Sequence, residues 1–210
     1  MKVIAFSLWG DNPKYTVGAV NNAKIAKDLF PDWTCRFYIA PDVPQHIVQQ
    51  LGQLDSECCP MAGSGWNGMF WRFFAADSHD TMISRDTDSR LGKREKAAVD
   101  EWLASDKDFH IMRDHPYHAT EILGGMWGVR NGLLKGIKGM IKNYNNGAFD
   151  DKYQVDQNFL KEVVYPMVKD NAIVHDEFFE KKPFPESAPK RTRENFVGQV
   201  YNYLDQTEFE

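Results

Sequence analysis

Hydrophobic positions in the first sixty residues alternate between compact runs and helical spacing. Residues 3–8 form a short apolar run that ends at "GDNP", which predicts a first strand. From residue 15 to residue 30 the apolar positions recur every three or four residues, which predicts a helix. "TCRFYIAP" predicts a second strand, "PQHIVQQL" a short helix and "SECCPM" a third strand. The chain therefore begins with strands and helices in alternation.

The same alternation continues to the end of the chain. "GSGWNGMFWRFFAADS" predicts a glycine-hinged loop and an aromatic helix, followed by the strand "DTMIS" and a helix over residues 93–104. "FHIMRD" and "ILGGMWGVR" are expected to be extended, and residues 133–144 helical. "QVDQNFLKEVVYPMV" predicts a helix that ends at Pro166, "AIVH" a last strand, and the polar, proline-rich residues after Glu180 a surface wrap. Alternating strands and helices predict an α/β fold with a mostly parallel sheet covered on both faces.

Composition restricts the class of protein further. The 210 residues are 42% hydrophobic and contain no clear linker, which predicts a single globular domain over 1–210. The net charge of −5 argues against a nucleic-acid-binding face. Three cysteines, two of them adjacent, indicate a reduced, cytoplasmic protein. No apolar run has the length of a transmembrane helix, and the N-terminal segment is typical of a strand and not of a signal peptide.

Candidate chemistry begins with "TMISRDTDSR", where Asp86 and Asp88 follow a short apolar run. In an extended segment residues i and i+2 point to the same side, so both carboxylates can face one point. Two close carboxylates repel each other unless a cation lies between them, and oxygen ligands suit Mg²⁺ or Mn²⁺ shared with phosphates. The alternative is a polar turn that caps the helix beginning near Lys93.

Two other acidic motifs do not fit this stretch. An EF-hand would need a third ligand where Arg90 stands and a closing glutamate where Ala97 stands. A phosphatase of the aspartyl-phosphate type would place its pair after the first strand, with Thr or Val where Ser89 stands. Both are therefore excluded.

An Asp-x-Asp pair after a middle strand of an α/β chain resembles the metal motif of GT-A fold glycosyltransferases, which have a Rossmann-like mixed sheet. "FSLWGDNPKYTVGA" resembles the opening of glycogenin-like transferases. The resemblance implies that Tyr15 stacks on uracil and that a base pocket is lined by Phe6, Ser7 and Leu8. It also implies that the donor diphosphate and its metal are held by Asp86, Thr87 and Asp88.

Three later stretches extend the resemblance in the right order. They are "ILGGMWGVRNG", "VDQNFL" and "VHDEFFEKKPF", and the run from residue 85 to residue 118 is similar to a group of bacterial and virus-encoded transferases. The resemblance implies a nucleotide-binding half over 1–90 and an acceptor-binding half over 91–210. It implies a UDP-sugar donor with Mn²⁺ or Mg²⁺ and a glycan or glycoprotein acceptor, and a host cytoplasm if the chain is virus-encoded.

The last of these stretches carries two candidate residues. His175 ends a short apolar run, where a surface histidine is the ordinary interpretation. Together with Asp86 and Asp88 it is expected to be the third metal ligand, because imidazole tolerates manganese. Lys182 is a candidate donor ligand, although the Lys-Pro pair lies one residue further from His175 than in the family and lacks the usual preceding glycine.

Arginines near the Asp-x-Asp pair are candidates for binding anions. Arg72 lies among five apolar neighbours, so it needs an anionic partner. It is either paired structurally with Asp77 or Asp86, or clamps the diphosphate or the metal-bound carboxylates. Arg85 and Arg90 are expected either to neutralise phosphate or to be solvated.

Carboxylates later in the chain are candidates for the transfer step. Asp156 opens a helix, either as a charge favoured by the helix dipole or as a catalytic group at the sugar–acceptor junction. In an inverting enzyme it would be the general base, and in a retaining enzyme it would stabilise positive charge. Asp114 is the second candidate for this catalytic role.

Polar and glycine positions near the same region are candidates for binding sugars. His115 and His118 follow a strand and could bind acceptor or donor-sugar hydroxyls, or belong to a polar loop. Gly124 and Gly125 would let a backbone approach the sugar, or form a plain β-bulge. The sequence thus favours a metal-dependent glycosyltransferase. Two rivals stay open: another metal-dependent enzyme on phosphorylated substrates, such as a nucleotidyltransferase or phosphatase, and a non-catalytic sugar-binding module.

Overall fold

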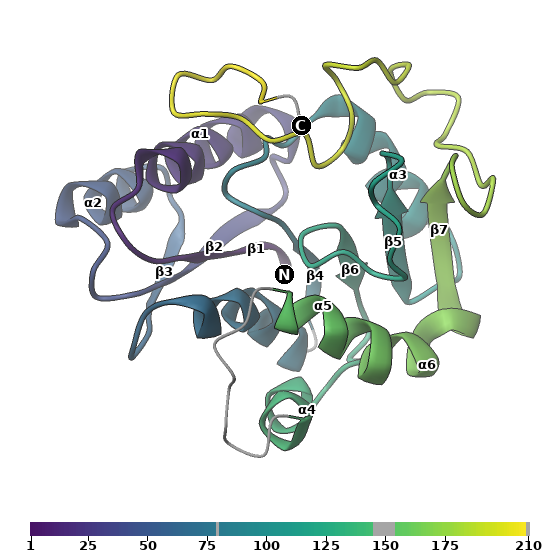
Figure 1. Ribbon diagram of the computed structural model, residues 1–210, viewed down its shortest axis with the longest axis horizontal. Helices are drawn as coiled ribbons and strands as arrows, with labels where there is room; N and C mark the ends of the chain where they lie inside the picture. The colour runs from purple at the N-terminus through teal and green to yellow at the C-terminus, as the bar shows by residue number, and fades with distance from the viewer. Residues whose placement is uncertain (79, 145–153, 209–210) are drawn as a thin grey trace.

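The computed structural model describes residues 1–78, 80–144 and 154–208, and its described strands form one continuous sheet (Figure 1). The strands are β1 (Lys2–Leu8), β2 (Thr34–Ile39), β3 (Glu57–Pro60), β4 (Thr81–Ser84), β5 (Phe109–Arg113), β6 (Trp127–Val129) and β7 (Ala172–Asp176). The helices are α1 (Pro13–Leu29), α2 (Gln45–Gln53), the 3₁₀ helix η1 (Trp66–Asp77), α3 (Lys93–Ala104), α4 (Ile137–Tyr144), α5 (Val155–Phe159), the π-helical turn η2 (Leu160–Val164), α6 (Tyr165–Val168) and the 3₁₀ turn η3 (Lys169–Asn171).

The sheet has the strand order β3-β2-β1-β4-β6-β5-β7. β1 runs parallel to both β2 and β4, and β5 runs parallel to β7. β6 alone among the described strands is antiparallel to its neighbours, β4 and β5. The expected mixed, mostly parallel sheet is confirmed, with the "ILGGMWGVR" segment as the inserted antiparallel strand.

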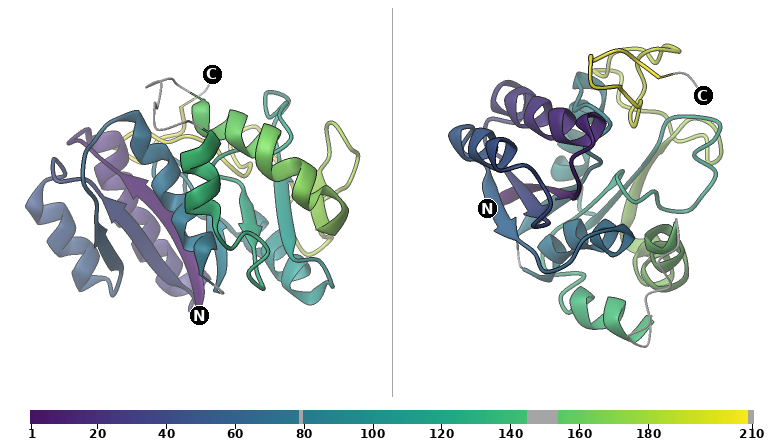
Figure 2. Two further views of the ribbon diagram at one scale, coloured as in Figure 1. Left: turned by 90° about the horizontal axis from the view of Figure 1, so that it is seen from below. Right: turned by 60° about the vertical axis from the view of Figure 1, so that its left-hand side comes forward.

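Helices cover both faces of this sheet, as the uninterrupted burial of its central strands requires. β1 is buried along all but its first residue. Figures 1 and 2 show α1, α2 and α3 on one face, and η1, α4, α5 and α6 on the other. The start of α1 is set by Asn12, whose side chain accepts a hydrogen bond from the backbone N–H of Lys14 at 3.0 Å, and by Pro13 in the first turn. The loop after β1 is thereby fixed at the carboxyl end of the sheet.

Two predicted helices differ from the structure. The aromatic segment η1 is a 3₁₀ helix, which brings eight of its twelve residues into the core. The helix expected to stop at Pro166 continues through it to Val168. Proline lacks an N–H and collides with the carbonyl four residues earlier, and the preceding π-helical turn η2 changes this spacing so that the helix can continue.

The C-terminal residues form a defined layer. We call residues 196–208 the C-terminal strap; it lies beside α1 in Figure 1 and its Val200 makes a bridge with Ser89. The expected surface wrap is therefore a specific contact with the loop that follows β4. None of the described helices combines the length and apolarity needed to cross a bilayer.

Candidate functional site

Three predicted site residues meet at the carboxyl end of β4. Arg72 comes from η1, Asp86 from the loop after β4, and Asp156 from the first turn of α5. The guanidinium of Arg72 pairs with Asp86 Oδ1 through Nη1 and with Asp156 Oδ2 through Nη2 at 3.0 Å. Arg72 and Asp156 are both buried. The two alternatives for Arg72 merge here, because its structural partner is the candidate metal ligand Asp86; Asp77 instead accepts from the backbone N–H of Gly136 at 2.6 Å.

The glycine pair lies directly against this cluster. A Cβ on Gly124 would lie 2.5 Å from Arg72 Nη2 and 2.6 Å from Asp156 Oδ2, and a Cβ on Gly125 would overlap the carboxylate of Asp86. Ser84 holds the loop in place by donating its hydroxyl to the Gly124 carbonyl at 2.7 Å. Only residues without side chains fit here, so in this structure Gly124 and Gly125 serve the approach of the loop to the charged cluster.

Burial raises the pKa of two carboxylates at this site, Asp156 within the cluster and Asp88 on the same loop as Asp86. Burial raises the pKa of Asp156 to about 6, with Arg72 opposing the rise and Asp86 adding to it. Burial also raises the pKa of Asp88 to about 6, and the charge of Asp86 adds to the rise. Oδ1 of Asp156 is buried and accepts no hydrogen bond within the described part of the chain. Perturbed carboxylates of this kind gather at functional sites.

The donor set fits a divalent cation that keeps ligands from water and substrate. Asp86 and Asp88 provide two hard carboxylates close enough for the charge of one to raise the pKa of the other. Within the described residues no group of three His, Cys, Asp or Glu side chains converges to form a complete cage. Mg²⁺ and similar ions are commonly bound by one or two carboxylates plus phosphate oxygens. The pair therefore fits a metal shared with a phosphorylated substrate.

His175, expected as the third ligand, lies elsewhere. It is buried in β7, and three strand spacings, roughly 14 Å, separate β7 from β4 in the sheet order. Its Nδ1 lies 2.8 Å from Nε2 of His110, and its Nε2 lies 2.6 Å from Glu101 Oε2 on α3. Both ring nitrogens are thus engaged between the sheet and α3. The structure therefore does not bring His175 to Asp86 and Asp88, because the strand order separates the carboxyl ends of β4 and β7.

Three other predicted cations are held by carboxylates away from the cluster. Lys182 pairs with Glu180 at 2.7 Å in the loop after β7, so it shares the displacement of His175. Arg85 is buried and paired with Glu95 of α3, which makes it a structural ion pair. Arg90 pairs with Asp205 of the C-terminal strap at 2.8 Å and donates to the Thr87 carbonyl at 3.2 Å. All three cations are thus held by carboxylates outside the Arg72 cluster, and Arg90 also holds the Asp-x-Asp loop through the Thr87 carbonyl.

Asp114 also has a structural role. It is fully buried and accepts two hydrogen bonds from Arg94, at 2.8 and 2.9 Å. Its Oδ2 accepts a third from the backbone N–H of Val197 at 2.8 Å. These contacts fasten the C-terminal strap, at Val197, to α3 and to the end of β5. In this structure Asp114, the second candidate for the catalytic carboxylate, therefore anchors the strap.

The predicted base pocket is only partly available. Phe6 and Leu8 are buried, and Phe6 stacks on Phe37 with ring centroids 4.7 Å apart, so their side chains belong to the core. Ser7 accepts a hydrogen bond from the backbone N–H of Arg72 at 2.9 Å and so positions Arg72. Tyr15, in the first turn of α1, is 38% exposed. Of the proposed base contacts, Tyr15 is the side chain that a nucleotide can reach.

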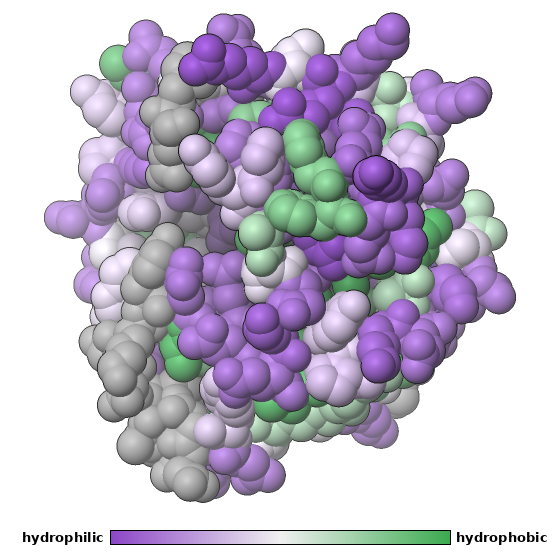
Figure 3. Space-filling model, turned by 45° about the vertical axis from the view of Figure 1, so that its right-hand side comes forward, coloured by the Kyte–Doolittle hydropathy of each residue, from purple (hydrophilic) through white to green (hydrophobic). Residues whose placement is uncertain are grey.

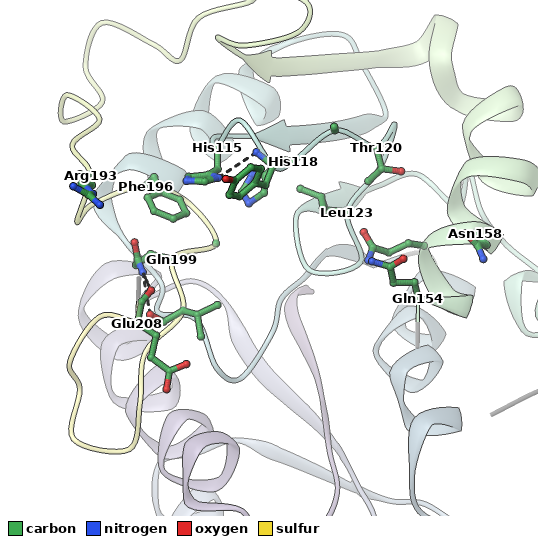
Figure 4. Close-up of a pocket in the computed structure, with 15 residues that line it drawn as sticks. His115, His118, Thr120, Leu123, Gln154, Asn158, Arg193, Phe196, Gln199 and Glu208 are labelled. Atoms are coloured by element: carbon green, nitrogen blue, oxygen red, sulfur yellow. Dashed lines mark hydrogen bonds between the residues drawn. The ribbon is translucent and has the colours of Figure 1, made fainter. Parts of the chain in front are cut away.

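A cavity of about 490 Å³ lies beside the cluster. Figure 4 shows His115, His118 and Phe196 on one side of it, Gln154 and Asn158 on the α5 side, and Leu123 between them. Leu123 precedes Gly124 in the chain, and Gln154 lies two residues before Asp156, so the cavity adjoins the charged cluster through the backbone. Amide and imidazole groups line it together with the charged side chains of Arg193 and Glu208, which suits a polar ligand.

His118 is a neutral member of this lining. Burial lowers its pKa to about 4, and the neighbouring His115 acts in the same direction. Its Nδ1 accepts the backbone N–H of Asp114 at 3.0 Å, so the ring proton lies on Nε2. His118 therefore offers one donor to the cavity at neutral pH. Figure 3 shows one face of the molecule, which is largely hydrophilic and carries hydrophobic residues in small groups.

Sequence reasoning missed the contacts that hold the Asp-x-Asp loop. Gly18 of α1 packs so closely on the Thr87 carbonyl that any Cβ would overlap it. Thr87 itself is buried, so it contributes to the loop through its backbone and not through an exposed hydroxyl. The glycine in "YTVGA" was the available signal, since an isolated helical glycine often marks a close approach of another backbone.

Comparisons with known proteins place this fold. No protein-family model matches the chain, and no curated protein matches it by sequence. The galactosyltransferase LgtC, in complex with donor and acceptor sugar analogues, superposes with a TM-score of 0.54 over 84% of this chain and 74% of its own, at 11% identity. Glucosyl-3-phosphoglycerate synthase from Mycobacterium tuberculosis, in complex with Mn²⁺, UDP-glucose and phosphoglyceric acid, has a TM-score of 0.52 over 83% and 69%, at 14% identity. The chain has the GT-A fold of these glycosyltransferases.

The same fold also carries a different reaction. 4-diphosphocytidyl-2C-methyl-D-erythritol synthase from Anaerococcus prevotii superposes with a TM-score of 0.50 over 88% of this chain and 92% of its own, at 10% identity. At these identities the likeness shows the fold alone. The reaction of this chain therefore has to be argued from its own site.

Proposed function

We propose that this chain is a metal-dependent glycosyltransferase that moves a sugar from a UDP-sugar to a glycan or glycoprotein acceptor. The observation that carries the proposal is the cluster in which Arg72 joins the metal-binding candidate Asp86 to a second carboxylate, Asp156. In this proposal Asp86 binds the metal at the leaving diphosphate, and Asp156 acts at the sugar. The cavity beside Asp156 provides room for an acceptor.

The nucleotide half of the proposal rests on the carboxyl ends of β1 and β4. Asp86 and Asp88 would hold Mn²⁺ or Mg²⁺, which neutralises the charge that develops on the leaving diphosphate. Arg72 is a positioning residue, because it fixes the orientation of Asp86 through a charge-assisted hydrogen bond. Tyr15 would pack on the base, near the end of β1.

The sugar half rests on Asp156 and the cavity. One oxygen of Asp156 is held by Arg72, and the other is buried without a partner in the described chain, which suits a hydrogen bond to a substrate hydroxyl. As a base it would take a proton from the acceptor hydroxyl, and in a retaining reaction it would stabilise positive charge on the sugar. His115 and His118 would bind acceptor hydroxyls, with Gly124 and Gly125 lining the approach.

A panel of nucleotide-sugars, tested with and without Mn²⁺, examines the proposal. Sugar transfer releases UDP, whereas a nucleotidyltransferase would release pyrophosphate, and a phosphatase would release phosphate. A non-catalytic sugar-binding module would bind saccharides without any need for nucleotide. The proposal is supported if UDP stabilises the protein against thermal unfolding only with metal, and if UDP is released from the UDP-sugar when an acceptor is added. Release of pyrophosphate contradicts it.

Replacing Gly125 with alanine is expected to weaken Mn²⁺-dependent UDP binding by about tenfold. The new methyl group would overlap the Asp86 carboxylate, and such overpacking costs about 1–3 kcal/mol in a rigid site. Titration of UDP by calorimetry at fixed Mn²⁺ measures the change. Gly139→Ala in α4 is the matched control, because its Cβ would meet nothing within 4 Å. Equal UDP affinity in both variants would show that Asp86 does not hold the donor.

Replacing Tyr15 with alanine is expected to weaken UDP binding by about 1–3 kcal/mol, the scale of base stacking on aromatic rings. Tyr15 is the exposed aromatic side chain in the first turn of α1. Tyr117→Ala, which removes an exposed ring at the cavity, should leave UDP affinity unchanged. If the Tyr15 variant binds UDP as the wild type does, the base lies elsewhere.

A further inference from the structure

The C-terminal strap is fastened to the Asp-x-Asp loop along its length. The backbone N–H of Tyr201 donates to the carbonyl of Asp88 at 2.8 Å. Asp205 accepts from Arg90 of the same loop at 2.8 Å and from Asn21 of α1 at 2.7 Å. The ring of Tyr201 also lies 5.2 Å from the guanidinium of Arg90. The strap is therefore positioned by several contacts beside the candidate metal ligands.

The end of this strap pairs a carboxylate with Lys14 of α1, which lies one helical turn before Gly18, the residue that packs on the Thr87 carbonyl of the Asp-x-Asp loop. Lys14 Nζ lies 2.6 Å from Glu208 Oε2, in the first turn of α1. Burial acts to lower the pKa of Lys14, but the hydrogen bond that Lys14 donates to Glu208 and the charges of Asp88 and Glu208 outweigh it and raise the pKa. Lys14 thus interacts with Asp88 on the metal loop and with Glu208 on the strap. The contact between α1 and the Asp-x-Asp loop does not depend on Glu208, because Gly18 packs directly on the Thr87 carbonyl.

We propose that Lys14 binds the donor diphosphate and that Glu208 is a built-in competitor which the donor displaces. The proposal rests on the proposed function, because it takes Asp86 and Asp88 as the metal site. A metal-bound diphosphate at Asp88 would bring phosphate oxygens near the ammonium of Lys14, and lysine is a common point-charge partner for phosphate. Glu208 already supplies such an oxygen to Lys14, so the structure represents a self-inhibited form.

The Lys14–Glu208 ion pair is weak enough for a bound diphosphate to displace Glu208. The two side chains are 26% and 41% exposed, and ion pairs of this exposure contribute little in water. Such a pair can shift donor affinity by about two- to fivefold without preventing binding. The contacts of Asp205 with Arg90 and Asn21 remain when Glu208 leaves, so the strap as a whole stays attached.

Displacement of Glu208 would also change the shape of the neighbouring cavity. Glu208, Gln199 and Val200 line its wall, and Gln199 Nε2 donates to the backbone carbonyl of Glu208 at 2.9 Å. Donor binding would thus change the wall of the proposed acceptor cavity. This contact connects the two halves of the site through one side chain.

Titration of UDP in the presence of Mn²⁺ tests the competition in the full chain. Glu208→Gln is expected to tighten UDP binding by about two- to fivefold, and Lys14→Met to weaken it. In the Lys14→Met background, Glu208→Gln should have no further effect. Asp55→Asn is the matched control, since Asp55 pairs with another α1 lysine, Lys27, at 2.8 Å on the exposed surface.

Each other outcome overturns the proposal in a recognisable way. Unchanged affinity in Glu208→Gln shows that Glu208 does not compete, and weaker affinity makes Glu208 a donor or metal ligand. Tightening that persists in the Lys14→Met background, or that also occurs in Asp55→Asn, shows a general charge effect. If Glu208→Gln has no effect while Asp88→Asn loses Mn²⁺-dependent UDP binding, the competition fails and the proposed function stands. If neither the wild type nor any variant binds UDP in the presence of Mn²⁺, the proposed function itself fails.

Discussion

Replacing Asp156 with asparagine is expected to lower sugar transfer by at least about a hundredfold while UDP-sugar affinity stays within about threefold of wild type. A general base or a charge stabiliser acts in the transition state, so its loss reduces turnover more than donor binding. The substitution keeps the shape of the side chain and removes the charge that is buried beside Arg72. Steady-state kinetics and UDP-sugar titration of the same preparation measure the two effects.

Asp114→Asn provides the contrast for this prediction. Asp114 is buried and held by Arg94 and by the backbone of Val197, so its variant should lose thermal stability and keep the turnover of its folded fraction. If Asp156→Asn keeps its turnover and loses UDP-sugar binding, Asp156 belongs to the donor or metal shell. If neither changes, its carboxylate serves only the start of α5.

Replacing Asp88 with asparagine is expected to reduce transfer by at least about a hundredfold, because the metal contribution to such reactions is several kcal/mol. Mn²⁺-dependent UDP binding should fall with it, and the fold should be kept. Calorimetric titration with and without Mn²⁺, together with circular dichroism, separates lost binding from lost structure. Transfer at the wild-type rate would remove Asp88 from the metal site.

The same variant should be more stable than the wild type when metal is absent. The pKa of Asp88 is raised to about 6 by burial and by Asp86, so the native carboxyl keeps its proton to a higher pH than the unfolded chain does. Its charge therefore destabilises the native state increasingly between about pH 4 and pH 6, and fully above that range. With a discount for partial solvent exposure, Asn at this position should stabilise the metal-free protein by about 1 kcal/mol at pH 7. Thermal melts in a metal chelator check this, and equal melting temperatures would contradict the electrostatic account.

Much of the fold was predictable because strands and helices follow local periodicity. The buried run of residues 3–8 and the helical spacing of residues 15–30 became β1 and α1, and the alternation of elements predicted the mixed, mostly parallel sheet. The passage of the helix through Pro166 was not predictable from the sequence. It depends on a π-helical turn, whose formation is decided by packing against the rest of the protein.

The site also has one part that the sequence predicted and another that only the tertiary structure decided. The sequence by itself predicted that Asp86 and Asp88 lie close together after a strand, from the side-chain alternation of an extended chain. The structure places Asp88 in a turn beyond β4, where the charge of Asp86 raises the pKa of Asp88. Only the tertiary structure decided that Arg72 joins Asp86 to Asp156, while His175 lies three strands away in β7, with His110 and Glu101. These partners are far apart in the chain, and strand order decides which of them meet. A periodic pattern records which face of an element is buried, but it does not record which other element covers that face.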